Sequence, residues 1–329
     1  MQIKQCYNFC MRKHSVRRNI LLGMGVFLVA VLLVPYAVPI PERQPLISYQ
    51  DMLTPASKFV LVEGASIHVE DYMPSGAVKD TIVLIHGFGG STYSWRNNIT
   101  AFTEAGYRTV AIDLKGFGLS TKNKASSYSH TSQAGIVSEV VSSLGIQSAI
   151  FIGHSMGASV TLQLAENYST MVKELVLVDG SVSFKQQLPI SQLLGFDPFR
   201  RILQDVMGRY LTSERLGTIL RSAYYQPDKL SGTDLANYYS RAVYGQWLDG
   251  LTAMSRDSNE NIVDFTFNKN IRTLVVWGDK DTWVGRSVAE EITSFTGGNL
   301  KILENAGHLS MEEAPDAFNN MVLEFLAQS

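Results

Sequence analysis

The stretch Ala149-Ile-Phe-Ile-Gly-His-Ser-Met-Gly157 decides how this chain folds. Residues 149–152 are apolar or small and predict a buried strand, and residues 158–168 predict a helix. Between them lies a Gly-x-Ser-x-Gly pentapeptide, whose serine would stand clear of the sheet on a sharp turn. Gly153 and Gly157 suit such a strained turn, because side chains there would collide with it. We predict that Ser155 is an exposed nucleophile; the competing hypothesis is a chance match in a glycine-rich loop.

The rest of the chain alternates short apolar runs with helical patterns. The predicted strands are 58–63, 67–72, 81–85, 109–112, 149–152, 175–178, 273–277 and 300–303. The predicted helices of the same region are 93–105, 130–144, 158–168, 289–295 and 314–327. Strands that alternate with helices over short loops predict an α/β fold, with a mostly parallel sheet and helices on both faces.

Polar side chains follow six of the predicted strands, at the point where each strand ends. They are His86, Asp113, Ser155, Asp179, Asp281 and His308. In open parallel sheets, ligands bind outside the carboxyl ends of the strands. We therefore expect these side chains to gather at one edge of the sheet, around a binding site.

Residues 182–265 interrupt the alternation with helical patterns over 190–209, 213–225 and 233–254 that are rich in aromatic residues. A structureless loop of this length is improbable. We expect a helical cap over the edge that carries Ser155, inserted between the two core segments 58–181 and 266–329. The alternative role for the aromatic residues is to form the cap's own core.

Charge and cysteine content limit the kinds of partner. Residues 1–41 hold five of the 28 basic residues and none of the 30 acidic ones, so the remainder is acidic. An acidic main domain argues against a nucleic-acid partner. The chain's two cysteines are Cys6 and Cys10, which excludes disulfides and thiolate metal sites from the main domain. We expect neither a cofactor nor a metal.

The N-terminal segment predicts a membrane span. Residues 20–34 are all apolar or glycine, and residues 35–40 add no charge, giving about the 20 residues that a bilayer requires. Basic residues precede the span, so residues 1–19 are expected in the cytoplasm and the main domain outside it. Residues 41–57 form the predicted linker. The competing interpretation is a cleaved signal peptide and a secreted or periplasmic protein.

A serine hydroxyl becomes a good nucleophile only when a base takes its proton and an acid orients that base. Of the six histidines, His308 alone stands on a loop directly after the last predicted strand, behind a glycine that permits a tight turn. The candidate acids are Asp281, Asp279 and Asp179. Asp281 is favoured, because its loop can turn at Gly278 and bring the carboxylate back toward His308.

Residues 58–329 resemble an α/β-hydrolase of the helical-cap type. Five motifs carry the resemblance: His86-Gly-Phe-Gly89, Asp113-x-x-Gly116-x-Gly118-x-Ser120, Gly153-His-Ser-Met-Gly157, Gly278-x-x-Asp281 and Gly307-His308. The order Ser, Asp, His along the chain is that of the family. One departure is Gly285, where relatives often carry proline. A serine at the nucleophile position argues against the epoxide hydrolase and haloalkane dehalogenase branches, which use aspartate.

The resemblance implies a mechanism in which Ser155 attacks an acyl carbonyl, His308 is the base and Asp281 holds the imidazole. It implies an oxyanion hole built from the backbone N–H groups of Phe88 and Met156. The expected function is a membrane-anchored hydrolase of carboxylic esters or lipids with apolar acyl groups, similar to the esterase and monoacylglycerol-lipase branches. The alternatives are a carbon–carbon bond hydrolase, a cofactor-free perhydrolase and a catalytically idle binding protein.

Overall fold

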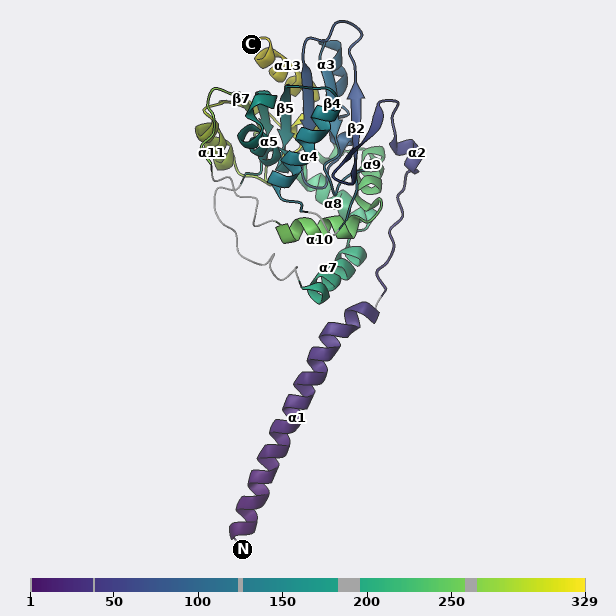
Figure 1. Cartoon of the computed structure of the whole chain (residues 1–329), viewed down its shortest axis with the longest axis vertical. Helices are drawn as coiled ribbons and strands as arrows, with labels where there is room; N and C mark the ends of the chain where they lie inside the picture. The colour runs from purple at the N-terminus through teal and green to yellow at the C-terminus, as the bar shows by residue number, and fades with distance from the viewer. Residues whose placement is uncertain (1, 38, 124–126, 183–195, 258–264, 329) are drawn as a thin grey trace.

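An eight-stranded sheet forms the centre of the computed structural model, which describes residues 2–37, 39–123, 127–182, 196–257 and 265–328 (Figure 1). The strand order is β1-β2-β4-β3-β5-β6-β7-β8. Strands β3 to β8 run parallel, whereas β1 and β2 form an antiparallel hairpin that pairs with β4. The strands are β1 (Ser57–Val62), β2 (Ala65–Tyr72), β3 (Thr81–Ile85), β4 (Arg108–Ile112), β5 (Ala149–His154), β6 (Val172–Val178), β7 (Arg272–Gly278) and β8 (Asn299–Leu303). The predicted fold class is confirmed.

Helices cover both faces of the sheet, and successive strand residues point alternately into the two layers. In β3, Val83 and Ile85 pack with α4 (His130–Ser143) and α5 (Met156–Asn167), while Ile82 and Leu84 pack with α3 (Ile99–Glu104) and α13 (Pro315–Leu326). The remaining core helices are α11 (Arg286–Thr296) and the short α12 (Ser310–Glu313). Burial on both faces explains why the parallel strands are continuous apolar runs.

Two predicted helices are each divided in the structure. The helix expected over 93–105 is wrong, because the chain forms the 3₁₀ helix η1 (Thr92–Trp95) and then α3. Between these helices, the Asn98 side chain donates hydrogen bonds to Met311 O and Asn319 Oδ1, which ties the chain to the C-terminal helices. The single helix expected over 233–254 is also wrong, because Gly245 turns the chain with φ +64°.

Among the described residues between β6 and β7, the chain forms the helices α7 (Asp197–Tyr210), α8 (Ser213–Ala223), α9 (Gly232–Val243) and α10 (Trp247–Asp257). A 3₁₀ turn, η3 (Pro227–Lys229), joins α8 to α9. We propose that these helices form the cap expected over residues 182–265, and we call them the cap helices. Within that range, residues 183–195 and 258–264 lie outside the described part of the chain. The first six residues of the helix predicted over 190–209 fall there.

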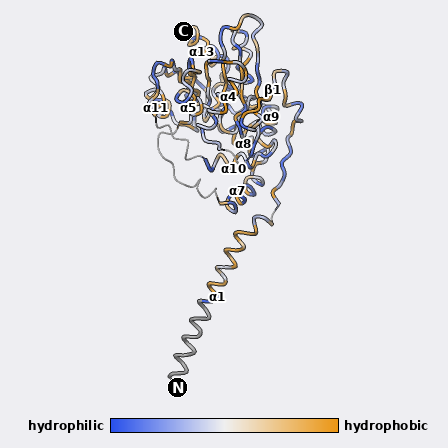
Figure 2. The backbone as a smooth tube through the Cα atoms, in the orientation of Figure 1, coloured by the Kyte–Doolittle hydropathy of each residue, from blue (hydrophilic) through white to orange (hydrophobic). Residues whose placement is uncertain are grey.

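The N-terminal helix α1 (Gln2–Ala37) projects from the rest of the molecule, and its described apolar half is evident in Figure 2. The segment Arg18–Ala37 is long and apolar enough to cross a membrane, and all of its residues except Pro35 are exposed or half-buried. The helix therefore contains most of the predicted span, and it continues back through the basic leader. Such a helix is compatible with a membrane anchor and with a signal sequence.

The segment between α1 and β1, expected to be a plain linker, is bound to the cap helices. It contains the short helix α2 (Tyr49–Met52). The backbone N–H groups of Leu46 and Ile47 donate to Ser240 Oγ, at 2.9 and 3.0 Å. Arg241 donates to the carbonyl oxygen of Met52 at 2.8 Å. These contacts hold the segment along α9.

Candidate active site

Ser155 stands at the junction of β5 and α5 in a strained conformation, with φ 50° and ψ −117°. A Cβ atom at Gly153 would lie 2.4 Å from Gly157 O, and one at Gly157 would lie 2.3 Å from Ile85 O. Distances this short are prohibitive, so only glycine fits at either position. The turn expected from the pentapeptide is therefore present, and its serine lines a pocket.

The structure brings Ser155, His308 and Asp281 into one chain of hydrogen bonds. His308 Nε2 lies 2.9 Å from Ser155 Oγ, and His308 Nδ1 lies 2.8 Å from Asp281 Oδ2. The other carboxylate oxygen of Asp281 accepts the backbone N–H groups of Trp283 and Val284. An imidazole whose Nδ1–H donates to a carboxylate presents Nε2 as an acceptor for the serine proton. This arrangement can activate a serine hydroxyl.

The loop that carries His308 is bound to the cap helices on one side and to a buried carboxylate on the other. The His308 N–H donates to Ala223 O, the last residue of α8, at 2.7 Å. The Gly307 N–H donates to the Glu313 carboxylate at 2.7 Å. The Trp283 ring stacks on the His308 imidazole, with 5.3 Å between centroids. The sequence predicted none of these supports, because no local pattern marks the contacts of His308 with Ala223 and Trp283 or the bond from Gly307 to Glu313.

The two other candidate acids lie elsewhere. Asp279 accepts from the Ala306 N–H and forms an ion pair with Lys280, so it stabilises the loop. Asp179, buried at the end of β6, accepts from the Gly278 N–H at 2.7 Å and from the Ser310 hydroxyl. Burial, helped by the charge of Asp281, raises the pKa of Asp179 to about 7, against the opposing influence of His308 and its hydrogen bonds.

His86 and Asp113 fix the loops beside the pocket. His86 Nε2 accepts from the Leu114 N–H, so this imidazole connects the ends of β3 and β4. Asp113 accepts from two backbone N–H groups and binds His68 Nδ1 at 2.8 Å. Although burial opposes ionisation, the His68 imidazole and these hydrogen bonds hold the pKa of Asp113 well below its usual range. These contacts show that Asp113 stabilises the loop after β4, and its pairing with His68 was not predicted from the sequence.

The two predicted oxyanion-hole residues flank Ser155. Phe88 lines the same pocket as Ser155, on a loop so close that a Cβ at Gly87 would lie 2.9 Å from Ser155 Cβ. Met156 is the first residue of α5. The N–H groups of a helix's first turn have no acceptor within the helix, so the Met156 N–H is free of the α5 hydrogen-bond ladder. Their role in binding an oxyanion remains a proposal.

The pocket at Ser155 has a volume of about 480 Å³ and lies between the core loops and the cap helices. Its apolar walls come from both: Phe88, Phe117, Met207, Leu211, Leu216, Ile219, Leu220, Trp247, Leu251, Met254, Trp283, Val284 and Leu309. Two buried cations, Lys122 and Arg241, also line it. Burial lowers the pKa of the Lys122 ammonium to about 8 and lowers the pKa of Arg241 as well.

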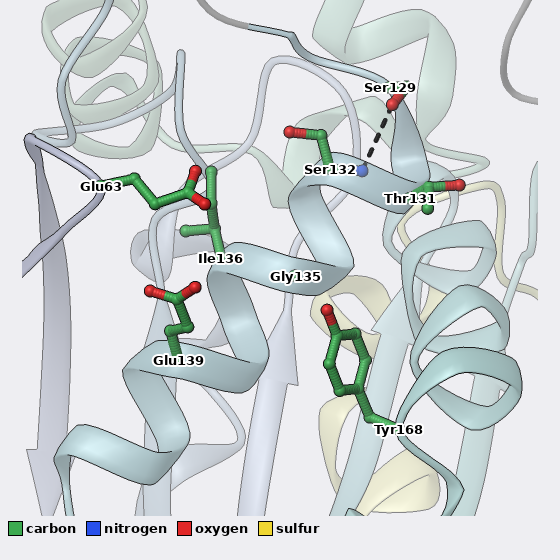
Figure 3. Close-up of a pocket in the computed structure, with 8 residues that line it drawn as sticks. All are labelled: Glu63, Ser129, Thr131, Ser132, Gly135, Ile136, Glu139 and Tyr168. Atoms are coloured by element: carbon green, nitrogen blue, oxygen red, sulfur yellow. Dashed lines mark hydrogen bonds between the residues drawn. The ribbon is translucent and has the colours of Figure 1, made fainter.

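A second hollow, of about 550 Å³, lies at α4 and shares no lining residue with the pocket at Ser155 (Figure 3). Its lining is largely polar and includes the carboxylates of Glu63 and Glu139 and the hydroxyl of Tyr168. Ser129 Oγ accepts the Ser132 N–H there, which is an ordinary cap of α4. The pocket at Ser155 is therefore the candidate active site.

Comparison with known proteins identifies the family to which the chain belongs. The family model of the alpha/beta hydrolase fold matches residues 80–315. The chain belongs to this family, and its membership supports a hydrolase activity.

Several curated relatives that are similar to the chain carry the name 2-hydroxy-6-oxononadienedioate/2-hydroxy-6-oxononatrienedioate hydrolase. The protein from Paraburkholderia phymatum is 28% identical over 281 residues, covering 83% of this chain and 96% of the relative. A protein of the same name from Escherichia coli O139:H28 is 29% identical over 297 residues, covering 85% of this chain and 99% of the relative. These names describe hydrolases of carbon–carbon bonds.

Two solved structures illustrate the shared fold. The meta-cleavage product hydrolase CumD from Pseudomonas fluorescens IP01 is 20% identical, with a TM-score of 0.67, and covers 82% of this chain and 97% of its own. A bacterial membrane phospholipase A is 21% identical, also with a TM-score of 0.67, and covers 96% of this chain and 98% of its own. Because this second match covers 96% of the chain, it must include part of the 36-residue helix α1.

Proposed function

We propose that the chain is a serine hydrolase in which Ser155 is the nucleophile, His308 the general base and Asp281 the residue that orients His308. The observation that carries this proposal is the hydrogen-bond chain from Asp281 through His308 to Ser155. Ser155 Oγ attacks the carbonyl carbon of the substrate while His308 Nε2 accepts the hydroxyl proton. The N–H groups of Phe88 and Met156 stabilise the negative charge that develops on the carbonyl oxygen.

The second half of the proposed reaction uses the same residues. His308 donates its proton to the leaving group as the bond to the carbonyl carbon breaks, which leaves an acyl group on Ser155. A water molecule then attacks this acyl-enzyme, and His308 accepts the water's proton. Proton transfer back to Ser155 Oγ releases the carboxylic acid and restores the resting site. No cofactor takes part.

The preferred substrate in this proposal is a carboxylic ester with an apolar acyl chain. Met207, Leu216 and Trp247, from three different cap helices, face the cavity that contains Ser155. Apolar surface is stabilised by about 25 cal/mol for each Å² removed from water, so such walls bind a hydrocarbon chain. In a pocket with mostly apolar walls, the few polar groups orient the substrate. Here the polar groups at Ser155 would orient the ester carbonyl.

Hydrolysis of a carbon–carbon bond next to a carbonyl is the second candidate, and the names of the curated relatives favour it over ester hydrolysis. The names of these relatives describe dicarboxylates, and two cations in the pocket could bind such a substrate. Lys122 donates to Gly118 O, Arg241 donates to Asn237 and Met52, and neither cation is paired with a carboxylate in the described part of the chain. Buried charges without a counterion are costly, so an anionic substrate would stabilise both.

We propose that α1 is a retained anchor, with residues 1–19 in the cytoplasm and the hydrolase domain outside it. The apolar and mostly exposed window Arg18–Ala37 supports a span. The match to the membrane phospholipase A covers 96% of this chain, which is compatible with an apolar helix before the hydrolase domain in both proteins. Sequencing the N-terminus of the mature protein tests the proposal; loss of about 37 residues would establish a cleaved signal instead.

A paired substrate assay separates the candidate functions. Full-length protein would be given p-nitrophenyl esters of increasing chain length and, in parallel, a vinylogous diketone that carries a terminal carboxylate. Ester hydrolysis predicts turnover of the esters that rises with chain length, whereas carbon–carbon hydrolysis predicts turnover of the diketone. Lys122→Met keeps the length of the side chain without its charge, and it should lower kcat/KM for the carboxylate-bearing substrate only.

A fluorophosphonate probe provides the control for activity as such. Labelling of the wild type and none of Ser155→Ala would support a serine nucleophile. No labelling of either protein would favour the idle binding protein. Peracid formation from a short carboxylic acid and hydrogen peroxide, without ester turnover, would favour the perhydrolase.

A further inference from the structure

The cap helix α7 carries a stripe of exposed apolar side chains, which we call the α7 stripe. It consists of Phe199, Val206 and Tyr210, which are 44, 52 and 49% exposed, together with Phe196 just before the helix at 50%. Positions 199, 206 and 210 lie within about 40° of one another around a helix with 3.6 residues per turn. Phe196 packs on Phe199 with 5.7 Å between ring centroids, so these two rings form one end of the stripe.

The opposite face of α7 is buried and leads to the candidate active site. Gln204 and Gly208 are buried there, and Met207 lines the pocket that contains Ser155. Leu211, directly after the helix, lines the same pocket. One helix therefore separates the pocket from whatever covers the α7 stripe.

The end of α1 lies against this helix. Arg201 Nε donates to Pro35 O at 3.1 Å, and Arg209 Nη2 donates to Pro39 O at 3.0 Å. Pro35, within α1, is buried, and Ile40 lies so close that a Cβ at Gly208 would be 2.7 Å from its Cγ2. Figure 1 shows α7 as the cap helix next to the upper end of α1, on the side of the molecule away from the C-terminus. The end of α1 is thus fixed to the helix that carries the α7 stripe.

We propose that the α7 stripe inserts into the surface of the bilayer that α1 spans. The inference rests on the proposed anchor and goes beyond it. An anchor joined to the cap by a flexible linker would not fix the orientation of the cap helices relative to the membrane. Here the segment after α1 is bound to the cap: Arg43 donates to Gly208 O at 2.8 Å, and Ser240 accepts two further N–H groups. A helix whose end is fixed at the membrane surface holds its exposed aromatic side chains at the depth of the headgroups.

The occupant that best matches the α7 stripe is lipid rather than a second copy of the chain. The mostly exposed window Arg18–Ala37 ends at α7, the helix that carries the stripe, so a bilayer around α1 would lie next to the stripe. Arg209 flanks the stripe, and it is half exposed beside Asp205. A basic side chain at the edge of an apolar helical face extends to the phosphate layer while its methylene groups stay in the apolar region. The pocket would then open next to the lipid that supplies an apolar ester.

Spin-label accessibility in vesicles tests this placement with the full chain. Cys6 and Cys10 are first replaced by serine, and single cysteines are introduced as Val206→Cys, Val29→Cys and Val78→Cys, each carrying a nitroxide. Val206 reports on the α7 stripe and Val29 on α1; Val78 is 44% exposed in the loop before β3, at the end of the sheet opposite the pocket. The proteins are reconstituted in phosphatidylcholine vesicles, and collision rates with oxygen and with a water-soluble nickel chelate are compared.

We expect the oxygen-to-nickel ratio at Val206 and Val29 to exceed that at Val78 several-fold, because oxygen concentrates in lipid. A high ratio at Val29 with a Val206 ratio equal to that of Val78 would overturn the docking of the stripe while leaving the anchor intact. Low oxygen-to-nickel ratios at all three sites would overturn both the docking of the stripe and the membrane anchor. Low access of both reagents to Val206, with dipolar broadening between labels, would reject the bilayer in favour of a second copy. Soluble-ester turnover by the same labelled proteins reports separately on the proposed hydrolase.

Discussion

Two buried histidine–aspartate pairs with nearly the same geometry lie in this molecule, and only one of them faces the pocket. In each, a histidine stands between a serine and an aspartate: Ser155, His308 and Asp281 form the pocket array, and Ser57, His68 and Asp113 form the sheet array. The Nδ1-to-carboxylate distance is 2.8 Å in both arrays, and the Nε2-to-serine distances are 2.9 and 3.0 Å. An aromatic ring packs on each imidazole: Trp283 at 5.3 Å and Phe59 at 5.1 Å.

The serines differ in where the backbone places them. Ser155 has a positive φ at the end of a strand and lines the pocket. Ser57 belongs to strand β1, and its Oγ accepts the Thr54 N–H at 3.0 Å, which stabilises a turn. A hydrogen-bonded triad therefore does not make a nucleophile by itself. The serine must also stand where a substrate carbonyl can reach it and where donors can stabilise the resulting oxyanion.

Replacing each serine gives the largest expected contrast between the arrays. Ser155→Ala should lower kcat roughly a million-fold, because it removes the nucleophile. Ser57→Ala should leave kcat unchanged. Steady-state turnover of a soluble ester, with circular dichroism to verify folding, measures both. Residual activity of Ser155→Ala above roughly a thousandth of the wild type would indicate another nucleophile.

The two aspartates should divide activity from stability. Asp281→Asn should lower kcat by up to roughly ten-thousandfold with little change in KM, because the imidazole loses its orientation and charge stabilisation. Asp113→Asn should lower the free energy of unfolding by about 2–5 kcal/mol, because it weakens a buried pair and its backbone hydrogen bonds. Urea unfolding and steady-state kinetics on both variants check this division. A folded Asp281→Asn with full turnover would make Asp179 the acid to test next.

Asp179 and Asp113 should give opposite dependences of stability on pH. The pKa of Asp179 is raised to about 7 from 3.8, so the folded state keeps a proton that the unfolded state loses, and stability falls as pH rises from about 4 to 7. Asp179→Asn mimics the neutral form and should become more stable relative to wild type by up to about 1.4 kcal/mol per pH unit in that range. The pKa of Asp113 is lowered, so its contribution is lost on acidification below about pH 4. Urea unfolding at pH 2.5, 4, 5.5, 7 and 8 measures both; a pH-independent difference for Asp179→Asn would contradict the assignment.

The smallest expected effects concern the two aromatic rings. Trp283→Leu should lower kcat/KM by roughly two- to tenfold, because stacking of about 0.5–1.5 kcal/mol no longer fixes the His308 ring. Phe59→Leu should cost a similar free energy of unfolding and leave kcat/KM unchanged. Trp283→Phe retains a ring and should restore most of the loss. Equal effects of Trp283→Leu and Phe59→Leu on turnover would remove the functional distinction between the two rings.

Much of this protein follows from its sequence alone. The strand 81–85 has the predicted bounds, because the four consecutive apolar residues after Thr81 satisfy burial on both faces. Ser155 could be placed because its turn is local: strand, glycine, serine, glycine and helix are adjacent in the chain. His308 and Asp281 could be selected because both follow strands of a parallel sheet, so topology brings them to the same edge.

Other features were decided by the tertiary structure. The pairing of His68 with Asp113 joins residues 45 apart, and the bond from Gln226 to Glu313 joins residues 87 apart. No local pattern marks either contact. The burial of Lys122 and Arg241 at the pocket and the position of α7 beside α1 likewise depend on how distant segments pack. Periodicity determines which face of an element is buried, whereas the partner that covers it is determined only when the whole chain has packed.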